Sequence, residues 1–274
     1  MGRPGYLLLP TLLLIIIGFI ACNVDAAEPQ GVVLATGEWP PYVSKRMKNK
    51  GIFTEVITAV FKEMGMKPVY RFYPWKRVEE EVRNGRAYAS FPHVITPERS
   101  KVFHFSDSIM FSNGRMFYNT RKYPNGIEFV DMHDLKRYTV GGGTSYRHED
   151  MLRDLGLTIE YLPCEDQNIR KLFLGRLDLL PLDETAGLYN IRRVYPRRVH
   201  HFAFAEKPLT QDSLHLMIST EYPCSTRIER EFSQAFKRIK DNGVYRDICT
   251  RYGIITTSCK TPMHTGGEGF KSER

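Results

Sequence analysis

The sequence predicts an α/β protein made of two lobes of similar architecture. Short apolar runs typical of strands alternate with amphipathic helical stripes through most of the 274 residues, and this alternation favours a largely parallel sheet. This order of strands and helices occurs twice in the chain. The repeat is visible at residues 82–87 and 173–178, where in each case a helix stop and an arginine precede a strand. With 42% apolar and 26% charged residues, the composition excludes a disordered or fibrous chain.

The first occurrence of this order occupies residues 31–91. Residues 31–36 predict a short buried strand, and Glu38-Trp39-Pro40-Pro41-Tyr42 predicts a turn after it. An amphipathic helix that ends at Gly65 is predicted by the helical spacing of Phe53, Val56, Ile57, Val60, Phe61 and Met64. The other elements expected here are a strand at 68–73, a shorter helix with a stripe of Trp75, Val78 and Val82, and a strand at 87–91.

The second occurrence begins with a strand at residues 138–140 that leads into a glycine-rich turn. A helix around residues 147–155, a strand at 158–162, a helix that Gly175 stops and an apolar strand at 177–182 follow. After a further strand at 214–219, two apolar stripes on either side of Asp241-Asn242-Gly243 predict a pair of helices. Residues 260–274 are polar, and we expect them to fray.

The N-terminus has the features of an export signal, which we assign to residues 1–21. The apolar run from Leu7 to Ile20 suits a signal peptide and is short for a membrane span. Two processing sites fit. Phe19-Ile20-Ala21-Cys22 resembles the lipobox of bacterial lipoproteins and places a lipid on Cys22, whereas Val24-Asp25-Ala26 fits ordinary cleavage. We favour the lipobox, which predicts a periplasmic protein anchored to the membrane; the other site predicts a free periplasmic protein.

Export also permits disulfides among the four remaining cysteines, Cys164, Cys224, Cys249 and Cys259. A predicted helix of about 16 residues, roughly 25 Å long, separates Cys224 from the turn near Cys249. A disulfide between Cys224 and Cys249 would therefore be strained. We expect a disulfide between Cys224 and Cys259, with the tail folding back.

Three segments carry residues suited to a small charged ligand. Thr96 and Pro97 predict a helix N-terminus after a strand, and Arg99 adds a guanidinium that binds a carboxylate by two hydrogen bonds. The turn Gly141-Gly142-Gly143-Thr144-Ser145 brings backbone and hydroxyl donors to the end of another strand. Asp183 follows an apolar strand, at the edge where open α/β sheets bind ligands, and suits an ammonium group. The same aspartate also fits a helix N-cap.

Aromatic residues are expected at the rim of the same sheet edge. Trp39 and Tyr42 flank a Pro-Pro turn after the first strand, and Trp75 follows a later strand. Such rings stack on a ligand or cover a cation. Packing of the turns is the alternative for Trp39 and Tyr42.

The order of these segments resembles the bacterial extracellular solute-binding proteins of family 3, the polar amino-acid receptors of ABC importers. The resemblance covers roughly residues 31–255 and is carried by residues 36–42, 96–99, 105–107, 143–145, 167–178, 183–184 and 241–245. It implies a periplasmic binding protein-like (type II) clamshell without a cofactor. The first lobe comprises residues 28–117 and 214–259, the second residues 118–213, and hinge strands around 116–120 and 212–217 join them.

The resemblance also implies roles for individual residues. Arg99 grips the carboxylate of the ligand, and Gly143, Thr144 and Ser145 assist from the other lobe. Asp183 holds the ammonium group, and an aromatic ring near Trp39 lies against the ligand. The implied function is capture of a small amino-acid-like ligand for the membrane permease of an ABC importer, by a protein that we expect to be a monomer.

The stretch before Thr96 departs from the pattern of the family. Small Ser or Thr residues usually donate to the carboxylate there, whereas this chain has Phe91, Pro92 and His93. Pro92 has no N–H to donate, and the bulkier Phe91 and His93 reshape the expected pocket. We therefore count His93 among the ligand-binding residues, and the departure weighs against an ordinary α-amino acid as ligand.

Other functions on the same fold provide alternatives. Cyclohexadienyl dehydratases use the clamshell as enzymes, by resemblance, and Glu38, His93 and Glu165 are the residues available here as acid or base. A ligand-sensing receptor for a separate membrane partner is the second alternative. We expect no enzymatic activity.

Nucleic acids and metals are not expected as partners. The net charge is 39 − 31 = +8, but the basic residues are dispersed, with only Arg192-Arg193 and Arg197-Arg198 locally dense. The sequence has no nucleic-acid recognition motif. Its histidines lack zinc spacing, so we expect neither a metal nor a cofactor.

Overall fold

The computed structural model describes residues 31–143, 149–162 and 164–254. The strands are β1 (Val32–Thr36), β2 (Pro68–Phe72), β3 (Ala89–His93), β4 (His104–Phe105), β5 (Met110–Asn119), β6 (Val140–Gly143), β7 (Ile159–Leu162), β8 (Leu180–Asp183), β9 (Phe202–Phe204) and β10 (Thr210–Ile218). The helices are α1 (Ile52–Glu63), α2 (Trp75–Arg83), α3 (Pro97–Ser100), α4 (Glu149–Asp154), α5 (Glu165–Phe173), α6 (Glu184–Val194), α7 (Ser225–Asp241) and α8 (Val244–Arg251). Short 3-10 helices are η1 (Lys48–Lys50), η2 (Met132–Arg137) and η3 (Val199–His201).

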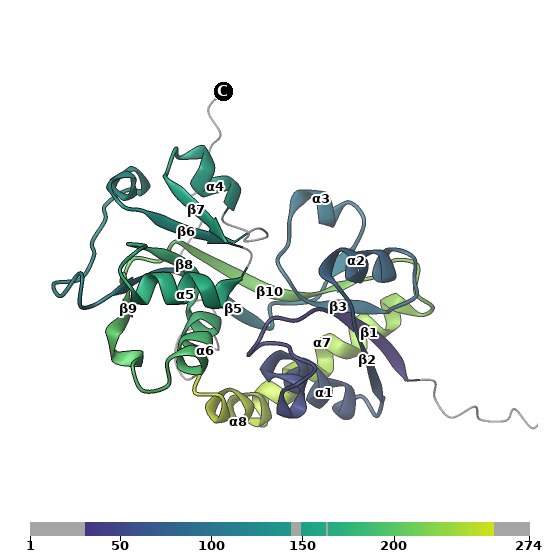
Figure 1. Ribbon diagram of the computed structural model, residues 1–274. Coiled ribbons are helices and arrows are strands. Elements are labelled where there is room, and N and C mark those ends of the chain that lie inside the picture. The colour runs from purple at the N-terminus through teal and green to yellow at the C-terminus, as the bar shows by residue number, and fades with distance from the viewer. Residues whose placement is uncertain (1–30, 144–148, 163, 255–274) are drawn as a thin grey trace, which may run out of the picture. The chain divides into compact units, whose positions relative to one another are not determined.

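The described strands form a mixed eight-stranded sheet and a separate pair. The large sheet has the order β2-β1-β3-β10-β5-β8, with β4 paired to β10 and β9 paired to β5, and β6 pairs with β7 (Figure 1). β1 is parallel to β2 and β3, and β6 is parallel to β7, as the alternation of strands and helices predicts. The centre of the sheet differs from this expectation, because β10 runs antiparallel to β3 and β5, and β5 runs antiparallel to β8 and β9.

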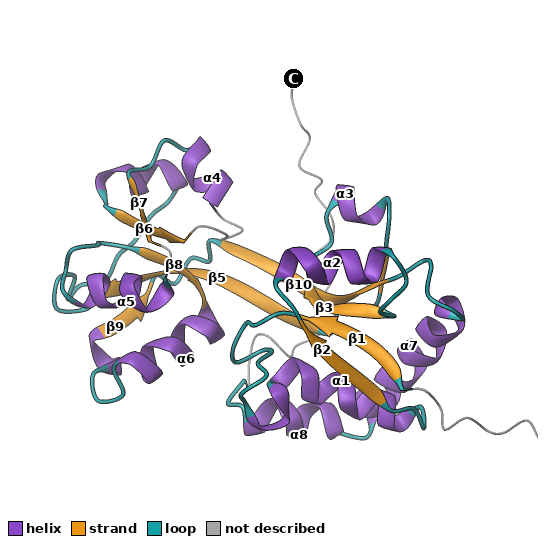
Figure 2. Cartoon of the chain, turned by 45° about the vertical axis from the view of Figure 1, so that its right-hand side comes forward, coloured by secondary structure: helices purple, strands orange, loops and turns teal. Residues whose placement is uncertain are grey.

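The antiparallel centre comes from two long strands. β5 has ten residues and β10 has nine, and they lie side by side along the middle of the sheet (Figure 2). Their ends contribute to different hydrophobic clusters. Met110 of β5 packs with Leu214 of β10 in one cluster, whereas Met116 of β5 packs in another together with Leu209, just before β10. Each long strand therefore passes from one core to the next.

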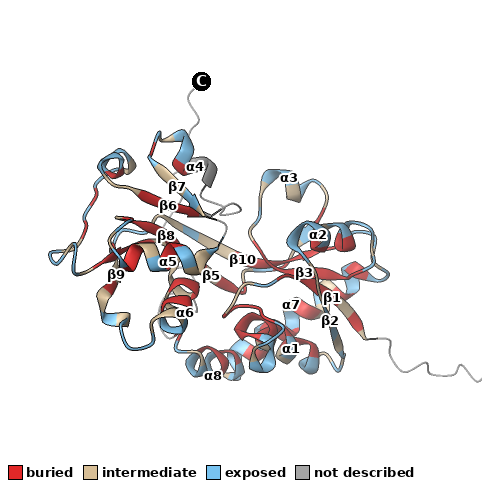
Figure 3. Ribbon diagram, in the orientation of Figure 1, coloured by how far each residue is buried: buried red, intermediate tan, exposed pale blue. Residues whose placement is uncertain are grey.

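The predicted helical stripes are buried where the sequence places them. α1 buries the apolar positions that face the sheet, and α7 buries all five residues of its predicted stripe, which are Ile228, Phe232, Ala235, Phe236 and Ile239 (Figure 3). Phe61 of α1 lies 5.9 Å from Phe232 of α7 between ring centroids. In α2, Val78 and Val82 are buried, but Trp75 keeps 37% of its surface exposed because it is the first residue of the helix, at the edge of the sheet.

The cysteines differ from the prediction. Cys224 is a free, exposed cysteine, which contradicts the expected disulfide between Cys224 and Cys259. Cys249, buried on α8, is disulfide-bonded. The geometry explains the difference, because Cys224 precedes the 17-residue helix α7, and α8 follows from the far end of that helix. Cys164 is also free and exposed, whereas Cys22 and Cys259 lie outside the described residues.

The predicted export signal at residues 1–21 and the tail at 260–274 also lie outside the described residues. None of the helices that the structure describes is both long enough and apolar enough to cross a bilayer. The boundaries of the two lobes stay a prediction.

Candidate functional site

The parallel strands bring the predicted site residues to one edge of the sheet. Thr36, the last residue of β1, is paired with Phe72 at the end of β2 and with Phe91 near the end of β3. The segments that follow these strands carry Trp39 and Tyr42 after β1, Trp75 after β2, and His93 and Arg99 at and after β3. The expectation that they share the carboxyl edge of the sheet is met.

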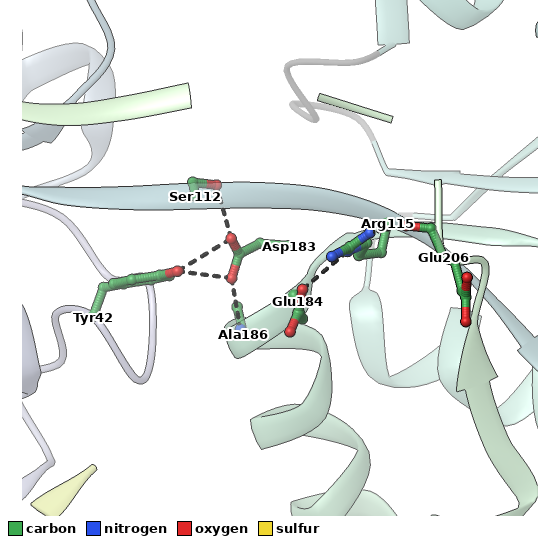
Figure 4. A network of polar contacts seen from close by, with 7 residues as sticks. All are labelled: Tyr42, Ser112, Arg115, Asp183, Glu184, Ala186 and Glu206. Atoms are coloured by element: carbon green, nitrogen blue, oxygen red, sulfur yellow. Dashed lines mark hydrogen bonds and ion pairs between the residues drawn. The ribbon is translucent and has the colours of Figure 1, made fainter. Parts of the chain in front are cut away.

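Asp183 ends β8 on the antiparallel side of the same sheet and caps α6. One carboxylate oxygen accepts a hydrogen bond from the backbone N–H of Ala186 at 2.7 Å, and the other accepts one from the hydroxyl of Ser112 at 2.7 Å. The hydroxyl of Tyr42 lies 3.1 Å from both oxygens (Figure 4). The N-cap alternative is therefore confirmed, and the same carboxylate also joins residues that are far apart in the chain.

The charge of Asp183 has no cationic partner among the described residues. The nearby guanidinium of Arg115 on β5 pairs instead with Glu184, at 2.9 Å, and donates to the backbone carbonyl of Glu206. Burial raises the pKa of Asp183 to about 6, although the bonds from Ala186, Ser112 and Tyr42 act to lower it. Neutral donors therefore compensate only part of the cost of desolvating this carboxylate.

Tyr42 has a different position from the one predicted. It is fully buried, and its ring centroid lies 4.5 Å from that of Trp39. Burial, followed by the charge of Asp183, raises the pKa of Tyr42 well above its ordinary value, so the phenol stays protonated and donates to the carboxylate. The packing alternative is thus the correct one for Tyr42, whereas Trp39 remains partly exposed at the edge.

Arg99 lies on the short helix α3, whose N-terminus is built as predicted. The hydroxyl oxygen of Thr96 accepts the backbone N–H of Arg99 at 3.3 Å, and Pro97 is the first helical residue. The side chain of Arg99 is 32% exposed. Its guanidinium lies 3.6 Å from a carboxylate oxygen of Glu79 on α2 and donates to the carbonyl of Val94 at 3.4 Å. These long contacts are weak, so the guanidinium can accept a better partner.

His93 is a buried histidine with an unpaired nitrogen. Its side chain is 6% exposed, and Nε2 has no hydrogen-bond partner in the described part of the chain. Burial and then the charge of Arg99 lower the pKa of His93 to about 3, so the imidazole is neutral. The ring of Trp75 meets it edge-on, with centroids 5.7 Å apart. Buried polar atoms are nearly always paired, so the unpaired Nε2 is an exception among the described residues that it shares with few other side-chain atoms.

The glycine-rich turn is described only in part. Gly143 ends β6, whereas Thr144 and Ser145 lie outside the described residues. Two surface hollows of about 790 and 930 Å³ lie elsewhere: residues 125–130 and 204–207 are part of the lining of the first, and α1, β2 and α8 border the second. Neither hollow is lined by Arg99 or Asp183.

Sequence reasoning missed Ser112 and Arg115. Both lie on β5, where polar residues interrupt an otherwise apolar strand. That interruption was the available signal, since a polar side chain inside a buried strand needs a partner. The identity of the partner was not available, because Ser112 and Asp183 are 71 positions apart.

The position of Trp75 depends on Gly37, and this gives a first testable prediction. A Cβ added at Gly37 would lie 2.4–2.8 Å from three atoms of the indole of Trp75, so Gly37→Ala must displace the ring. We expect a red-shifted tryptophan emission and a cost of about 1–3 kcal/mol in the free energy of unfolding. The measurement uses a Trp39→Phe background, so that Trp75 is the only emitter, and an unchanged spectrum there would contradict this contact.

Known proteins share the sequence pattern and the fold of this chain. The sequence matches the bacterial extracellular solute-binding proteins, family 3, over residues 32–254. No curated protein matches it. Among solved structures, the GluR0 ligand-binding core from Nostoc punctiforme in complex with L-glutamate has a TM-score of 0.65 at 18% identity, covering 81% of this chain and 99% of that one.

Two further solved structures share the fold. An ancestral amino acid-binding protein, a precursor of cyclohexadienyl dehydratase, has a TM-score of 0.62 at 18% identity and covers 81% of this chain and 94% of its own. The substrate binding protein of an amino acid ABC transporter has a TM-score of 0.60 at 16% identity, with 81% and 98% covered. The chain has the type II periplasmic binding protein-like α/β fold, and it belongs to the bacterial extracellular solute-binding proteins, family 3.

Proposed function

We propose that this protein captures a small amino-acid-like solute between two lobes outside the cytoplasm and delivers it to the permease of an ABC importer. The lobes are residues 28–117 with 214–259, and residues 118–213. The ligand lies at the carboxyl edge of the sheet, where the aromatic, cationic and acidic side chains described above gather. Membership of the family supports the solute-binding role, and the amino-acid-bound relatives support the ligand class.

The observation that carries the proposal is the uncompensated carboxylate of Asp183. A buried charge held only by neutral donors is unfavourable, and a cationic group of a ligand relieves that cost. The raised pKa of Asp183 expresses the same cost. An ammonium group beside this carboxylate completes the site and favours the charged form of the aspartate.

The opposite end of the ligand is assigned to Arg99 and His93. A carboxylate beside Arg99 replaces the long contact with Glu79 by a charge-assisted pair. A neutral imidazole with its proton on Nε2 donates to the same carboxylate. Trp75 borders this end, Trp39 borders the ammonium end, and Gly143, Thr144 and Ser145 add donors from the second lobe.

Closure of the lobes is the proposed mechanism. β5 and β10 connect the two cores, so rotation about them moves Asp183 relative to Arg99. The bond between Tyr42 and Asp183 spans 141 positions of the chain, and joins the first lobe to the second. A ligand that adds contacts on both sides stabilises the closed arrangement over the open one.

We propose binding without turnover. Among the candidate acids, Glu38 is exposed and accepts the backbone N–H of Lys45 at 2.9 Å, and Glu165 accepts a bond from Asn190. His93 is held neutral with a pKa of about 3 and is a poor base near neutral pH. These contacts favour structural roles. Attachment to the membrane through a lipid on Cys22 is part of the same proposal.

A thermal-shift screen with calorimetric follow-up tests the proposal. Amino acids, small peptides and organic acids are each added to the protein, and a ligand at about 100 times its dissociation constant adds ~2.7 kcal/mol of stability. We expect a hit that carries both a carboxylate and an ammonium group, and that is recovered chemically unchanged. A screen in which only ligands without a carboxylate bind, or one in which the hit is converted, would overturn it.

A further inference from the structure

A second charged site lies away from the sheet edge, around the turn from α6 to β9 (Figure 1). Four cationic or titratable side chains gather there: Arg121 after β5, and Arg198, His200 and His201 in and around η3. We call them the Arg–His cluster. Arg121, Arg198 and His200 are exposed, and His201 is half-buried.

The Arg–His cluster is fixed on an aromatic platform. The guanidinium carbons of Arg121 and Arg198 lie 4.4 and 5.3 Å from the centroid of the same ring, that of the buried Phe173. This ring stacks on Tyr195 at 4.4 Å, and the ring of His201 lies 6.0 Å from it. Two guanidinium groups and an imidazole therefore share one support.

The backbone holds the two histidines beside Arg121. The N–H of Thr120 donates to the carbonyl of His201 at 2.9 Å, and its hydroxyl donates to the carbonyl of His200 at 3.2 Å. The N–H of His201 donates to the carbonyl of Arg198 at 3.0 Å. The imidazoles of His200 and His201 have centroids 4.1 Å apart. The positions of the four side chains are thus set by the end of β5 and by η3.

The charge of the Arg–His cluster is not balanced by acids. No ion pair joins any of its four members to a carboxylate in the part of the chain that the structure describes, and the nearby acids Asp166 and Asp178 pair with Arg193 and Lys122. The pKa of His201 is lowered by burial and then by His200, Arg121 and Arg198, which are all cationic or become so. Like charges held close together on a rigid support favour a bound anion.

We propose that the Arg–His cluster binds a tetrahedral oxyanion of the phosphate type, either free or as the headgroup of an anionic phospholipid. Planar guanidinium forks match the oxygens of such a group by paired hydrogen bonds. Protonated imidazoles add two further donors, so binding strengthens as the histidines become charged. This site is separate from the solute site, and its existence does not depend on the proposed function.

The test uses inorganic sulfate, because sulfate stays a dianion while the histidines titrate. Histidine ring signals of the full chain are followed by NMR from pH 8 to pH 5.5, with and without sulfate. We expect sulfate to raise the titration midpoint of His201, since a bound anion favours the charged imidazole. We also expect the affinity for sulfate to rise toward pH 5.5.

Matched variants locate the site. Arg198→Gln and Arg121→Gln each remove one guanidinium, and we expect each to weaken sulfate binding about tenfold, the size of one lost charge-assisted bond. Arg230→Gln on α7 makes the same change of net charge on another exposed arginine and is expected to bind like the wild type. The guanidinium of Arg198 lies over the ring of Phe173 and makes no hydrogen bond or ion pair in the described part of the chain. Its variant therefore tests the site even if Arg121→Gln, which loses a bond to the carbonyl of Phe173, is unstable.

Two further arms identify the source of the anion. Inorganic phosphate that competes with sulfate supports a free oxyanion. Retention by phosphatidylglycerol vesicles but not by phosphatidylcholine vesicles, lost in Arg198→Gln, supports a lipid headgroup. The proposal would be overturned if the wild type and both cluster variants bound sulfate with equal affinity. It would also be overturned if sulfate left the histidine titration midpoint unchanged and both kinds of vesicle retained the protein equally.

Discussion

Replacing Asp183 by asparagine is expected to weaken binding of the cognate solute by about 2–5 kcal/mol, the range for removing one partner of a buried charge pair. Asparagine retains an oxygen that accepts the N–H of Ala186 and is an equally good N-cap, so α6 keeps its start. The cap survives, but the amide nitrogen that replaces the second oxygen can no longer accept the hydroxyl of Ser112, so that hydroxyl has to turn and accept from the amide instead. Calorimetric titration of wild type and Asp183→Asn with the ligand from the screen measures the difference, and equal affinities would remove Asp183 from the site.

The pH dependence of binding provides the control for this variant. Asp183 has a pKa of about 6 in the unliganded protein, so affinity for an ammonium ligand is expected to fall as the pH decreases through 6 and the carboxylate becomes neutral. Ser112→Ala removes a donor that lowers this pKa, so the fall should begin at a higher pH. Asp183→Asn should show no such fall.

The same group has the opposite effect on the stability of the unliganded protein. Because the folded pKa of Asp183 lies above its ordinary value of 3.8, the folded state binds more protons than the unfolded state between pH 4 and 6. The contribution of Asp183 to the free energy of unfolding is therefore fully present below pH 4, and it is lost as the pH rises through 6. Solute binding and stability without solute should respond to acid in opposite directions.

Arg99→Ala is the second large expected effect. Removing the guanidinium leaves the carboxylate of the ligand without a charged partner, and we expect a loss of about 2–5 kcal/mol in binding free energy. The folding free energy should change little, since the ion pair with Glu79 is long and partly exposed. Titration calorimetry measures the affinity, and thermal unfolding without ligand checks the fold.

Arg83→Ala is the matched control for Arg99→Ala. Arg83 on α2 also pairs with Glu79, at 2.9 Å, but it does not lie at the carboxyl edge of the sheet. Both variants lose one arginine and one contact to the same glutamate. If Arg83→Ala weakened binding as much as Arg99→Ala, the effect would come through Glu79, and Arg99 would not be the carboxylate partner.

The sequence predicted those parts of the fold that depend on local patterns. The stripes of α1 and α7, the cap of α3 by Thr96 and the helix after Asp183 all follow from spacing within a few residues. These features are decided by side chains on one turn or one face. The placement of Arg99 and His93 near one another followed from the same strand end.

The features that were missed depend on distant residues. The antiparallel pairing of β10 with β5 and the bond from Tyr42 to Asp183 join segments that no local pattern connects. For Tyr42 the sequence offered contact with a ligand or packing of the turn; its ring is buried, and the bond from its hydroxyl to the carboxylate was not expected. The disulfide assignment was wrong because it used Cys224, which is free and exposed before α7, whereas the bonded cysteine is Cys249 on α8, beyond the far end of that helix.

The packing of α1 against α7 and α8 has a consequence for the order in which the chain folds. The cluster that contains α1 also takes residues from α7 and α8, which are synthesised long after α1. The N-terminal third of the chain therefore has no complete interior while it is being synthesised, because the helices that cover α1 do not yet exist. A chain with this topology cannot complete its first core until α7 and α8 have been made, a delay that fits the export we propose, because an exported chain crosses the membrane before it folds.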